Sequence, residues 1–502
     1  MPEQFLHGIE IVEIDDGIRS IRTVKSSVIG VVGTAPDAEV AATASLDTGD
    51  PADDNAIRWT AKQPGRSGNS LAVVLKRPAA STPLSVSGAY GLVVVTCATD
   101  ALGAIESTAA QVIAAVNASP TASLLVTAAN APDSDGSGVI GVQAKTYLAG
   151  GLDDAFPYHT PVLVAGSRRE AARLDTTGAQ AGTLPRVMDD IFDQCNPIMV
   201  VIRVPEDADD QQTITNLIGG VNSQDGSYEG VHALEAARDR LGVIPRILIA
   251  PGFTHVEAVA QELIPIAERL KAMVIADGPN TTDEAAVQYR DRFGSPRLVL
   301  CDPWVKVRAG DGDEVRPLSG RAAGAWADSD ENRGFWWSPS NIEIQGIVGM
   351  ARPVSWALND PNTRANYLNE NEIVTVVAHE GYRLWGNRSC STDPRWAFIS
   401  TRRIADMLNE SLVVNHLWAV DRNITRTYLG DVTEGVNSYI RSLVAQGALL
   451  GGSCSPNGDL NTPANIADGK VFFDFDFTPP YPAEHITFRS HLVQDYLEEL
   501  VV

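Results

Sequence analysis

The stretch "PRILIAPGFTHVEAVAQELIPIAERLKAMVIADG", residues 245–278, decides the fold of the middle of the chain. Two short apolar runs, at 247–250 and 273–276, flank a longer segment that has the pattern of an amphipathic helix. Apolar runs separated by such helices are typical of parallel strands that are buried on both faces of a sheet. The stretch therefore predicts a strand, a helix and a second strand of a parallel sheet.

The same alternation continues on both sides of this unit, from Thr160 to about Asp311. Strands are predicted at 160–166, 197–204, 245–252, 273–278 and 297–305. Helices are predicted at 167–174, 184–195, 230–242, 255–272 and 281–294. We assign residues 151–325 to a middle α/β domain with a parallel sheet that helices cover on both faces.

The segment before this domain has a different composition. Residues 23–55 contain a first buried strand around Val28–Val32 and then an Ala-, Thr- and Asp-rich passage. Residues 56–150 are rich in Ala and Ser, with short strands and one helix. They predict a small inserted α+β or β-rich domain.

The last third of the chain, residues 326–480, is rich in tryptophan. Helices are predicted at 394–420 and 433–449, and a strand at 469–479. In that strand, Phe473, Phe475 and Phe477 share one face because side chains alternate along a strand. The predicted fold class is thus multidomain α/β and α+β.

Residues 7–20, "HGIEIVEIDDGIRS", predict a lone strand at the start of the chain. Ile9, Ile11 and Ile14 alternate with charged residues at nearly period two, until Gly17 closes the run. A single strand cannot satisfy its own backbone or bury its apolar face. It must pair with another strand, either in its own sheet or in a neighbouring molecule.

Composition excludes several classes of protein. The chain has 502 residues and a formal net charge of -24, which argues against nucleic-acid binding because that calls for a basic surface. No run approaches the roughly 18 apolar residues of a membrane-spanning helix. The first residues lack the basic and apolar parts of a signal peptide, so we expect none. The five cysteines are far apart, which favours free thiols over disulfides or a zinc site.

No catalytic motif accompanies the α/β domain. No glycine-rich phosphate loop follows a strand, and no GxSxG motif occurs. His379 and Glu380 lack the second histidine of an HExxH zinc helix. The acidic stretches at 133–138 and 309–317 suit a metal ion less well than a solvated turn. We therefore predict no catalytic, metal-binding or cofactor-binding residues and no cofactor, and an α/β enzyme is kept as an alternative.

Long stretches at both ends resemble the contractile tail sheath proteins of bacteriophages, of the kind found in P2-like and related myovirus tails. Residues 7–36 resemble the sheath N-terminus. "LWGNRSCSTDPRWAFISTRRIADMLNESL", residues 384–412, and "GKVFFDFDFTPPYPAEHITFRSHLVQDYLEEL", residues 469–500, resemble the sheath C-terminal domain. Residues 351–377 resemble the segment before that domain, and residues 61–75 the opening of an extra outer domain.

The resemblance implies a structural protein rather than an enzyme. Sheath subunits form hexameric rings that stack helically around a tail tube, between baseplate and tail terminator proteins. The sheath contracts and drives the tube through the host envelope. The chain is thus expected in the virion tail, assembled in the host cytoplasm, with no nucleic-acid partner and no membrane insertion. A phage-tail-like injection machine, or tailocin, is an alternative that the sequence leaves open.

In this family the inner, tube-facing domain combines the C-terminal part, here 326–480, with the N-terminal segment, and arms exchange strands between subunits. The resemblance therefore implies an N-terminal arm at 1–22 and a C-terminal arm at 481–502. The N-terminal strand residues are Gly8, Ile9, Glu10, Ile11, Val12, Glu13, Ile14 and Gly17. The C-terminal arm residues are Ile486, Phe488, Leu492, Tyr496 and Leu497. An intramolecular edge strand is the alternative for the N-terminal arm.

The resemblance implies that the helix carrying the adjacent Arg402 and Arg403 lies near the tube, so these two arginines of a strongly acidic chain are expected to face acidic residues of the tube. The alternative pairs one of them with Asp406 or Glu410 at helical spacing. The residue pattern favours neither.

Overall fold

The computed structural model describes residues 21–310 and 312–493. The chain divides into two compact units. The first, termed the core unit, comprises the chain up to Thr34, His159–Ala171 and the chain from Gly182 onward. The second, termed the inserted unit, comprises Ala35–Tyr158 and Ala172–Ala181. In these described ranges, no helix is both long enough and apolar enough to cross a membrane.

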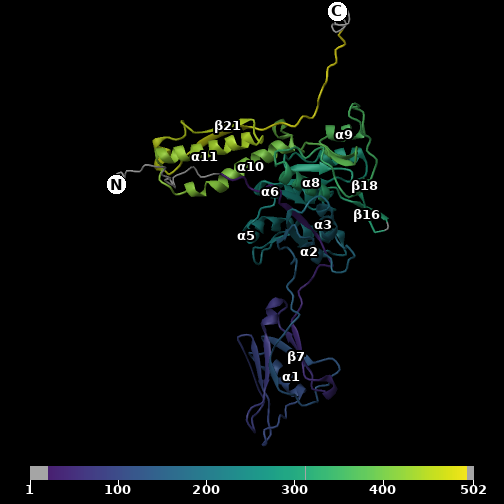
Figure 1. Ribbon diagram of the computed structural model, residues 1–502, viewed down its shortest axis with the longest axis vertical. Helices are drawn as coiled ribbons and strands as arrows, with labels where there is room; N and C mark the ends of the chain where they lie inside the picture. Colours follow the sequence, from purple (N-terminus) through teal and green to yellow (C-terminus); the bar gives the residue numbers. More distant parts are fainter. Residues whose placement is uncertain (1–20, 311, 494–502) are drawn as a thin grey trace, which may run out of the picture. The chain divides into compact units, whose positions relative to one another are not determined.

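An eight-stranded sheet forms the centre of the core unit (Figure 1). Its strand order is β20-β19-β15-β14-β13-β1-β10-β9. Neighbours from β19 to β10 run parallel, whereas the edge strands β9 and β20 are antiparallel to theirs. The strands are β1 (Ile29–Thr34), β9 (Val162–Ala165), β10 (Ile198–Val204), β13 (Ile247–Ile249), β14 (Met273–Asp277), β15 (Leu298–Cys301), β19 (Ile373–Ala378) and β20 (Tyr382–Trp385).

All five strands predicted between Thr160 and Asp311 belong to this sheet, but the sheet is not confined to residues 151–325. β1 lies between β13 and β10, and β19 and β20 extend the far side. Val31 and Val32 of β1 are fully buried, which a central position provides. A local pattern identifies a strand but not its neighbours in a sheet. The predicted limits of the middle domain, 151–325, therefore left out three strands of its sheet.

Helices cover both faces of the sheet, as predicted. Val32 of β1 and Val200 of β10 pack in one cluster with α6. Their neighbours along the strands, Val31 and Val201, are equally buried. Since side chains alternate across a strand, the second set faces the other side, where α3 and α8 contact the sheet. The helices are α2 (Arg168–Ala171), α3 (Leu184–Phe192), α4 (Asp210–Ile218), α5 (Ala237–Leu241), α6 (Glu257–Leu270), α7 (Asp283–Arg290), α8 (Ser319–Asn332) and α9 (Arg364–Glu370).

Two predicted helices form only in part. The segment predicted at 167–174 becomes the four-residue α2 and a short 3-10 turn. The segment predicted at 230–242 begins as a 3-10 helix and turns α-helical only at Ala237. Gly230 has a φ of 59°, and its nitrogen donates to His159 Nδ1 at 2.9 Å, so a tight turn replaces the first helical turn.

A small three-stranded sheet adjoins the main one in sequence. It consists of β16 (Val305–Ala309), β17 (Gly312–Arg316) and β18 (Ile347–Met350), in the order β17-β16-β18. The acidic stretch 309–317 is thus largely a strand, with a tight turn at Gly310. Arg308 and Asp313 form an exposed ion pair across the hairpin at 3.2 Å.

The last part of the core unit is a helical pair with a two-stranded sheet, termed the C-terminal module (Figure 1). It comprises α10 (Ile399–Asn415), α11 (Arg426–Ala445), β21 (Gly451–Pro456), α12 (Pro463–Ala467) and β22 (Phe473–Thr478). The helices share a core that includes Met407 of α10 and Tyr439 of α11. The three phenylalanines of β22 pack against this core, while Asp474 and Asp476 between them are exposed, as their alternation predicts.

The inserted unit has its own core around Trp59, which is fully buried and donates from Nε1 to Thr48 Oγ1 at 2.9 Å. It begins at Ala35 rather than at residue 56, because β2 pairs with β3 and joins the same sheet. One sheet contains β2 (Ser45–Thr48), β3 (Ile57–Ala61) and β7 (Val126–Asn130). The other contains β5 (Ser85–Ala89), β6 (Leu92–Thr96), β4 (Ala72–Lys76) and β8 (Gln143–Tyr147), and the single helix of the unit is α1 (Ala109–Ala118).

Candidate functional site

The first described residues lie against the C-terminal module. The Arg22 nitrogen donates to Asn415 Oδ1 at 3.1 Å, and the Arg22 oxygen accepts from Asn415 Nδ2 at 2.9 Å. The Val24 nitrogen donates to Ser411 Oγ at 3.2 Å. Ile21 and Val24 also pack against the core of the module. The chain therefore enters the core unit along α10 and α11.

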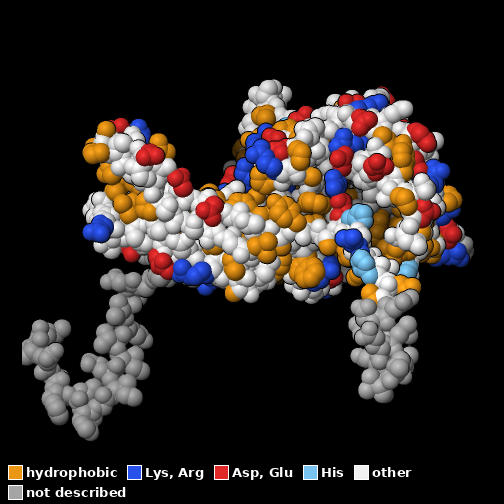
Figure 2. Space-filling view, turned by 90° about the horizontal axis from the view of Figure 1, so that it is seen from above, with side chains coloured by type: hydrophobic (Ala, Val, Ile, Leu, Met, Phe, Trp, Pro, Cys, Tyr) orange, Lys and Arg blue, Asp and Glu red, His pale blue; other side chains and the backbone are white. Residues whose placement is uncertain are grey.

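At its other end, the chain leaves the module as an extended segment, residues 479–493, which contains no helix or strand (Figure 1). The exposed fractions of Ile486, Phe488 and Leu492 are 66%, 92% and 98%. Figure 2 shows further hydrophobic side chains exposed along the module that carries α10 and α11. Exposed large apolar side chains on an extended segment are typical of surfaces that bind another protein chain.

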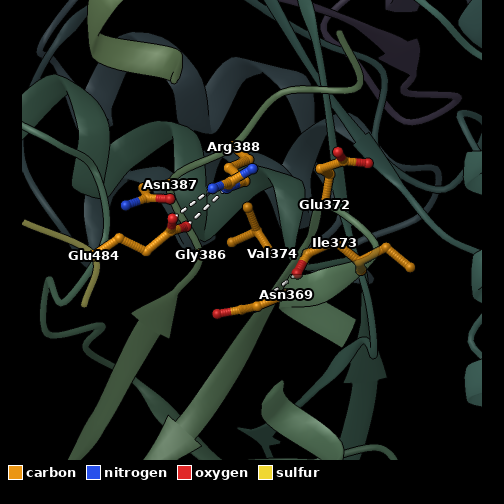
Figure 3. A pocket seen from close by; sticks show the side chains of 8 residues that line it. All are labelled: Asn369, Glu372, Ile373, Val374, Gly386, Asn387, Arg388 and Glu484. Atoms are coloured by element: carbon orange, nitrogen blue, oxygen red, sulfur yellow. Dashed lines mark hydrogen bonds and ion pairs between the residues drawn. The ribbon is translucent and has the colours of Figure 1, made fainter. Parts of the chain in front are cut away.

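An ion pair attaches the beginning of this segment to the core unit. Arg388 donates from Nε to Glu484 Oε1 at 2.8 Å and from a terminal nitrogen to Glu484 Oε2 at 2.6 Å. Figure 3 shows the two side chains pointing toward each other beside Asn387 and Val374. Glu484 raises the pKa of Arg388 through this hydrogen-bonded contact. The ring of Tyr481 lies edge-on to Phe398, with centroids 6.2 Å apart.

The two-stranded sheet β21–β22 has no third strand among the described residues. On β21, the Cys454 backbone is held by Asn437 of α11, which accepts at 2.7 Å and donates at 3.0 Å. The outer edge of β22 lacks a partner strand in residues 21–310 and 312–493. An unpaired strand edge is a template for an added strand, and a two-stranded sheet gains stability from one.

The predicted arm residues divide into those that the structure places and those that it does not. Ile486, Phe488 and Leu492 lie on the exposed segment. The residues from Gly8 to Gly17, and Tyr496 and Leu497, lie outside the described residues. Their pairing stays a prediction.

The two arginines predicted to face a tube form ion pairs with aspartates of the same chain. Arg403 is 4% exposed and pairs with Asp330 of α8, so the expectation that it faces outward is corrected. Arg402 pairs with Asp406 at 2.8 Å, the helical partner of the alternative interpretation. Its guanidinium also lies 4.2 Å from the ring centroid of Trp396. The spacing of charges along one helix could not reveal Asp330, which lies 73 residues earlier.

The carboxyl ends of the parallel strands, where α/β enzymes bind ligands, are closed by a structural network. Asp277 ends β14, is fully buried, and accepts from the Ser319 nitrogen at 2.8 Å and from Ser319 Oγ at 2.5 Å. Asp302 follows β15 and pairs with Arg352, which also pairs with Asp283 at 2.6 Å. These carboxylates hold neighbouring segments on the sheet. Within the described ranges, no cluster of His, Cys, Asp or Glu is arranged to hold a metal ion.

This network predicts a pH dependence of stability. Burial raises the pKa of Asp277 from 3.8 to about 7. Because the folded-state pKa lies above the unfolded one, the folded protein retains a proton that the unfolded chain loses. The contribution of Asp277 to the free energy of unfolding therefore falls as pH rises from about 4 to about 7. The substituted side chain in Asp277→Asn is neutral at every pH. The free energy of unfolding of this variant should therefore change less with pH between about 4 and about 7 than that of wild type.

Urea denaturation of Asp277→Asn and wild type at about pH 5 and about pH 8 measures the difference. Asp459→Asn changes an exposed carboxylate and is expected to keep the wild-type slope. An unchanged slope in Asp277→Asn would show that the buried carboxylate is ionised throughout.

Sequence reasoning missed the residues that hold the chain ends. Ser411 and Asn415 continue the buried face of α10 with polar side chains, and polar residues on an apolar stripe were the available signal. Arg388 and Glu484 are 96 residues apart and no local pattern links them. Only the folded chain brings these partners together.

Comparison with known proteins adds independent findings. Residues 226–390 match the family described as phage tail sheath protein central domain, and residues 391–492 match the phage tail sheath C-terminal domain. A prophage major tail sheath protein of Pseudomonas aeruginosa is 39% identical, over 73% of this chain and 93% of the relative. The tail sheath protein of Burkholderia phage BcepMu is 31% identical, over 99% of this chain and 98% of the relative.

Solved structures share the fold at lower identity. The contracted helical sheath of the anti-feeding prophage is 21% identical and has a TM-score of 0.53, covering 67% of this chain and 89% of its own. A chain of the contracted anti-feeding prophage baseplate is 19% identical, with a TM-score of 0.54, covering 71% of this chain and 98% of its own. With relatives at this identity and coverage, the chain belongs to the phage tail sheath protein family, whose members are structural components of contractile tails and not enzymes.

Proposed function

We propose that this chain is the repeating subunit of a sheath in which hexameric rings stack helically around a tail tube. Exchanged N- and C-terminal strands link the subunits. Contraction drives the tube through the host cell envelope, using energy stored in the extended assembly and no nucleotide. One observation carries the proposal: the same chain has an exposed apolar segment and a two-stranded sheet whose edge has no partner strand among the residues that the structure describes.

The donor and the acceptor are different surfaces of one subunit. Ile486 and Phe488 lie on the donor segment, and β22 forms the acceptor edge. A contact between unlike surfaces joins subunits head to tail, and it produces a helical filament unless the rotation closes a ring. Strand addition to a sheet edge is a known mode of such recognition.

The strength of the linkage comes from repetition. Each backbone hydrogen bond of a donated strand contributes about 1 kcal/mol net, and burial of its apolar side chains adds about 0.8 kcal/mol per methylene. One arm is therefore modest, but several arms per subunit hold the lattice together through multivalency. Gly8 and Gly17 flank the N-terminal strand and serve as hinges, so rings rotate while the pairing persists.

The proposed partners are further copies of this chain, the tail tube on the inside, and baseplate and terminator proteins at the ends. Assembly takes place in the host cytoplasm before the tail joins the virion. The C-terminal module supplies the tube-facing side. A tailocin would use the same subunit, and the similarity of fold to the anti-feeding prophage sheath favours keeping this second candidate.

Negative-stain electron microscopy of the purified full-length protein tests the proposal. We expect hollow tubes with a regular helical repeat at high protein concentration. Compact particles alone, both for the isolated protein and after co-expression with the tube protein of the same tail, would contradict it.

A further inference from the structure

The roots of the two arms are held at opposite ends of one helix. We propose that α10 is a strut that fixes the separation of the arm roots, with Asn415 and Arg388 as the residues that position them. This inference rests on the proposed function, in which the arms link subunits. The inference adds how one subunit keeps a constant distance between its two links to neighbouring subunits.

At the first root, a side chain takes the place of a neighbouring strand. The Asn415 amide both accepts from and donates to the Arg22 backbone, at 3.1 Å and 2.9 Å, as a paired strand would. Thr23 Oγ1 lies 2.9 Å from the Tyr439 hydroxyl, so a hydrogen bond joins Thr23 to α11. Ser411 is fully buried and binds the Val24 nitrogen. Three consecutive residues, 22–24, are thus fixed at the start of the described chain.

At the second root, the contacts gather at the start of α10. Phe398 is the N-cap residue of α10, and its ring contacts Tyr481 edge-on and lies 5.3 Å, at its centroid, from the guanidinium of Arg388. Arg388 holds Glu484 through two hydrogen bonds (Figure 3). All residues from 485 to 493 are exposed. Among the described residues, Glu484 is therefore the last one that the core unit holds.

The helix between the two roots is fixed to the sheet. Its 17 residues span about 25 Å at the usual helical rise. Arg297, just before β15, pairs with Asp406 at 2.5 Å, and Arg246, just before β13, pairs with Glu410 at 3.4 Å. Both arginines are buried. The sheet therefore holds α10 in place, and the separation of the two arm roots stays constant when either arm is pulled.

The first experiment uses Asn415→Ala in the full-length protein, with Asn409→Ala as the matched control because Asn409 is exposed on the same helix. Hydrogen exchange of the unassembled protein reports the root directly, since the Arg22 amide donates to Asn415. We expect exchange at Arg22 to rise about fivefold in Asn415→Ala, the factor that one net hydrogen bond gives, and to stay unchanged in Asn409→Ala. Unchanged exchange at Arg22 in Asn415→Ala would show that Asn415 does not hold the Arg22 backbone, and it would contradict the inference.

The second experiment uses charge reversal at the other root. Arg388→Glu and Glu484→Arg are each expected to reduce the pelleted tube fraction about tenfold or to change the helical rise, and the double variant is expected to restore both. Arg441→Glu, on the exposed face of α11, is the control. Normal tubes from both single variants would contradict the proposal that Arg388 positions the second arm root. If wild type forms no tubes either alone or after co-expression with the tube protein, the proposed function fails, and the exchange measurement still decides whether Asn415 holds the Arg22 backbone.

Discussion

Truncation after Glu484 is expected to leave a folded protein that forms no tubes. Residues 485–493 are exposed along their whole length, so their removal takes nothing from the core of the subunit. In the proposed function, assembly loses one of its two strand donors, and multivalent linkage falls steeply when a link is removed. Sedimentation and electron microscopy measure assembly, and thermal unfolding measures the fold. We expect the midpoint of unfolding within about 2 °C of wild type because the described residues that are removed, 485–493, bury no side chain.

Side-chain variants separate the chemistry of the arm from its length. Ile486→Ser with Phe488→Ser keeps the backbone but removes apolar surface from alternate positions, and it is expected to prevent tube formation as the truncation does. Thr487→Ala changes the position between them and is expected to form tubes like wild type. Tubes formed by the truncated protein would show that the C-terminal arm does not link subunits.

Replacement of Asp406 by alanine is expected to lower the free energy of unfolding by about 3–5 kcal/mol. Asp406 is 1% exposed and pairs with both Arg297 and Arg402. Its removal leaves the buried Arg297 guanidinium without its carboxylate, and desolvation of an unpaired charge is the main cost. The same change loosens α10 from the sheet. Urea denaturation of the unassembled protein, followed by tryptophan fluorescence, measures the loss.

An exposed ion pair provides the control for this variant. Glu434 pairs with Arg441 on the surface of α11, where the two side chains are 47% and 63% exposed. Glu434→Ala is expected to cost less than about 1 kcal/mol, because water already solvates both charges. A similarly small loss in Asp406→Ala would mean that Arg297 finds other partners, and that the ion pair does not hold α10 in place.

Much of the local structure follows from the sequence because each element carries its own pattern. Residues 245–278 fold as the predicted strand, helix and strand, and the helices α3, α6 and α7 form where they were expected. The alternation in β22 places its phenylalanines on the core and its aspartates in solvent. Errors lie at boundaries: α11 begins at Arg426, earlier than predicted, because Thr425 caps it by accepting from the Tyr428 nitrogen.

The family, the parallel α/β core and the alternation of phenylalanines and aspartates in β22 follow from the sequence alone. The folded chain was needed to show that β1 lies at the centre of the sheet, that Arg403 is buried against Asp330, and that residues 22 and 484 are held near opposite ends of α10. Periodicity is a property of neighbouring residues, so a single segment expresses it. Partners such as Arg388 and Glu484 are distant in the chain, and their contact exists only once the whole fold has fixed the geometry between them.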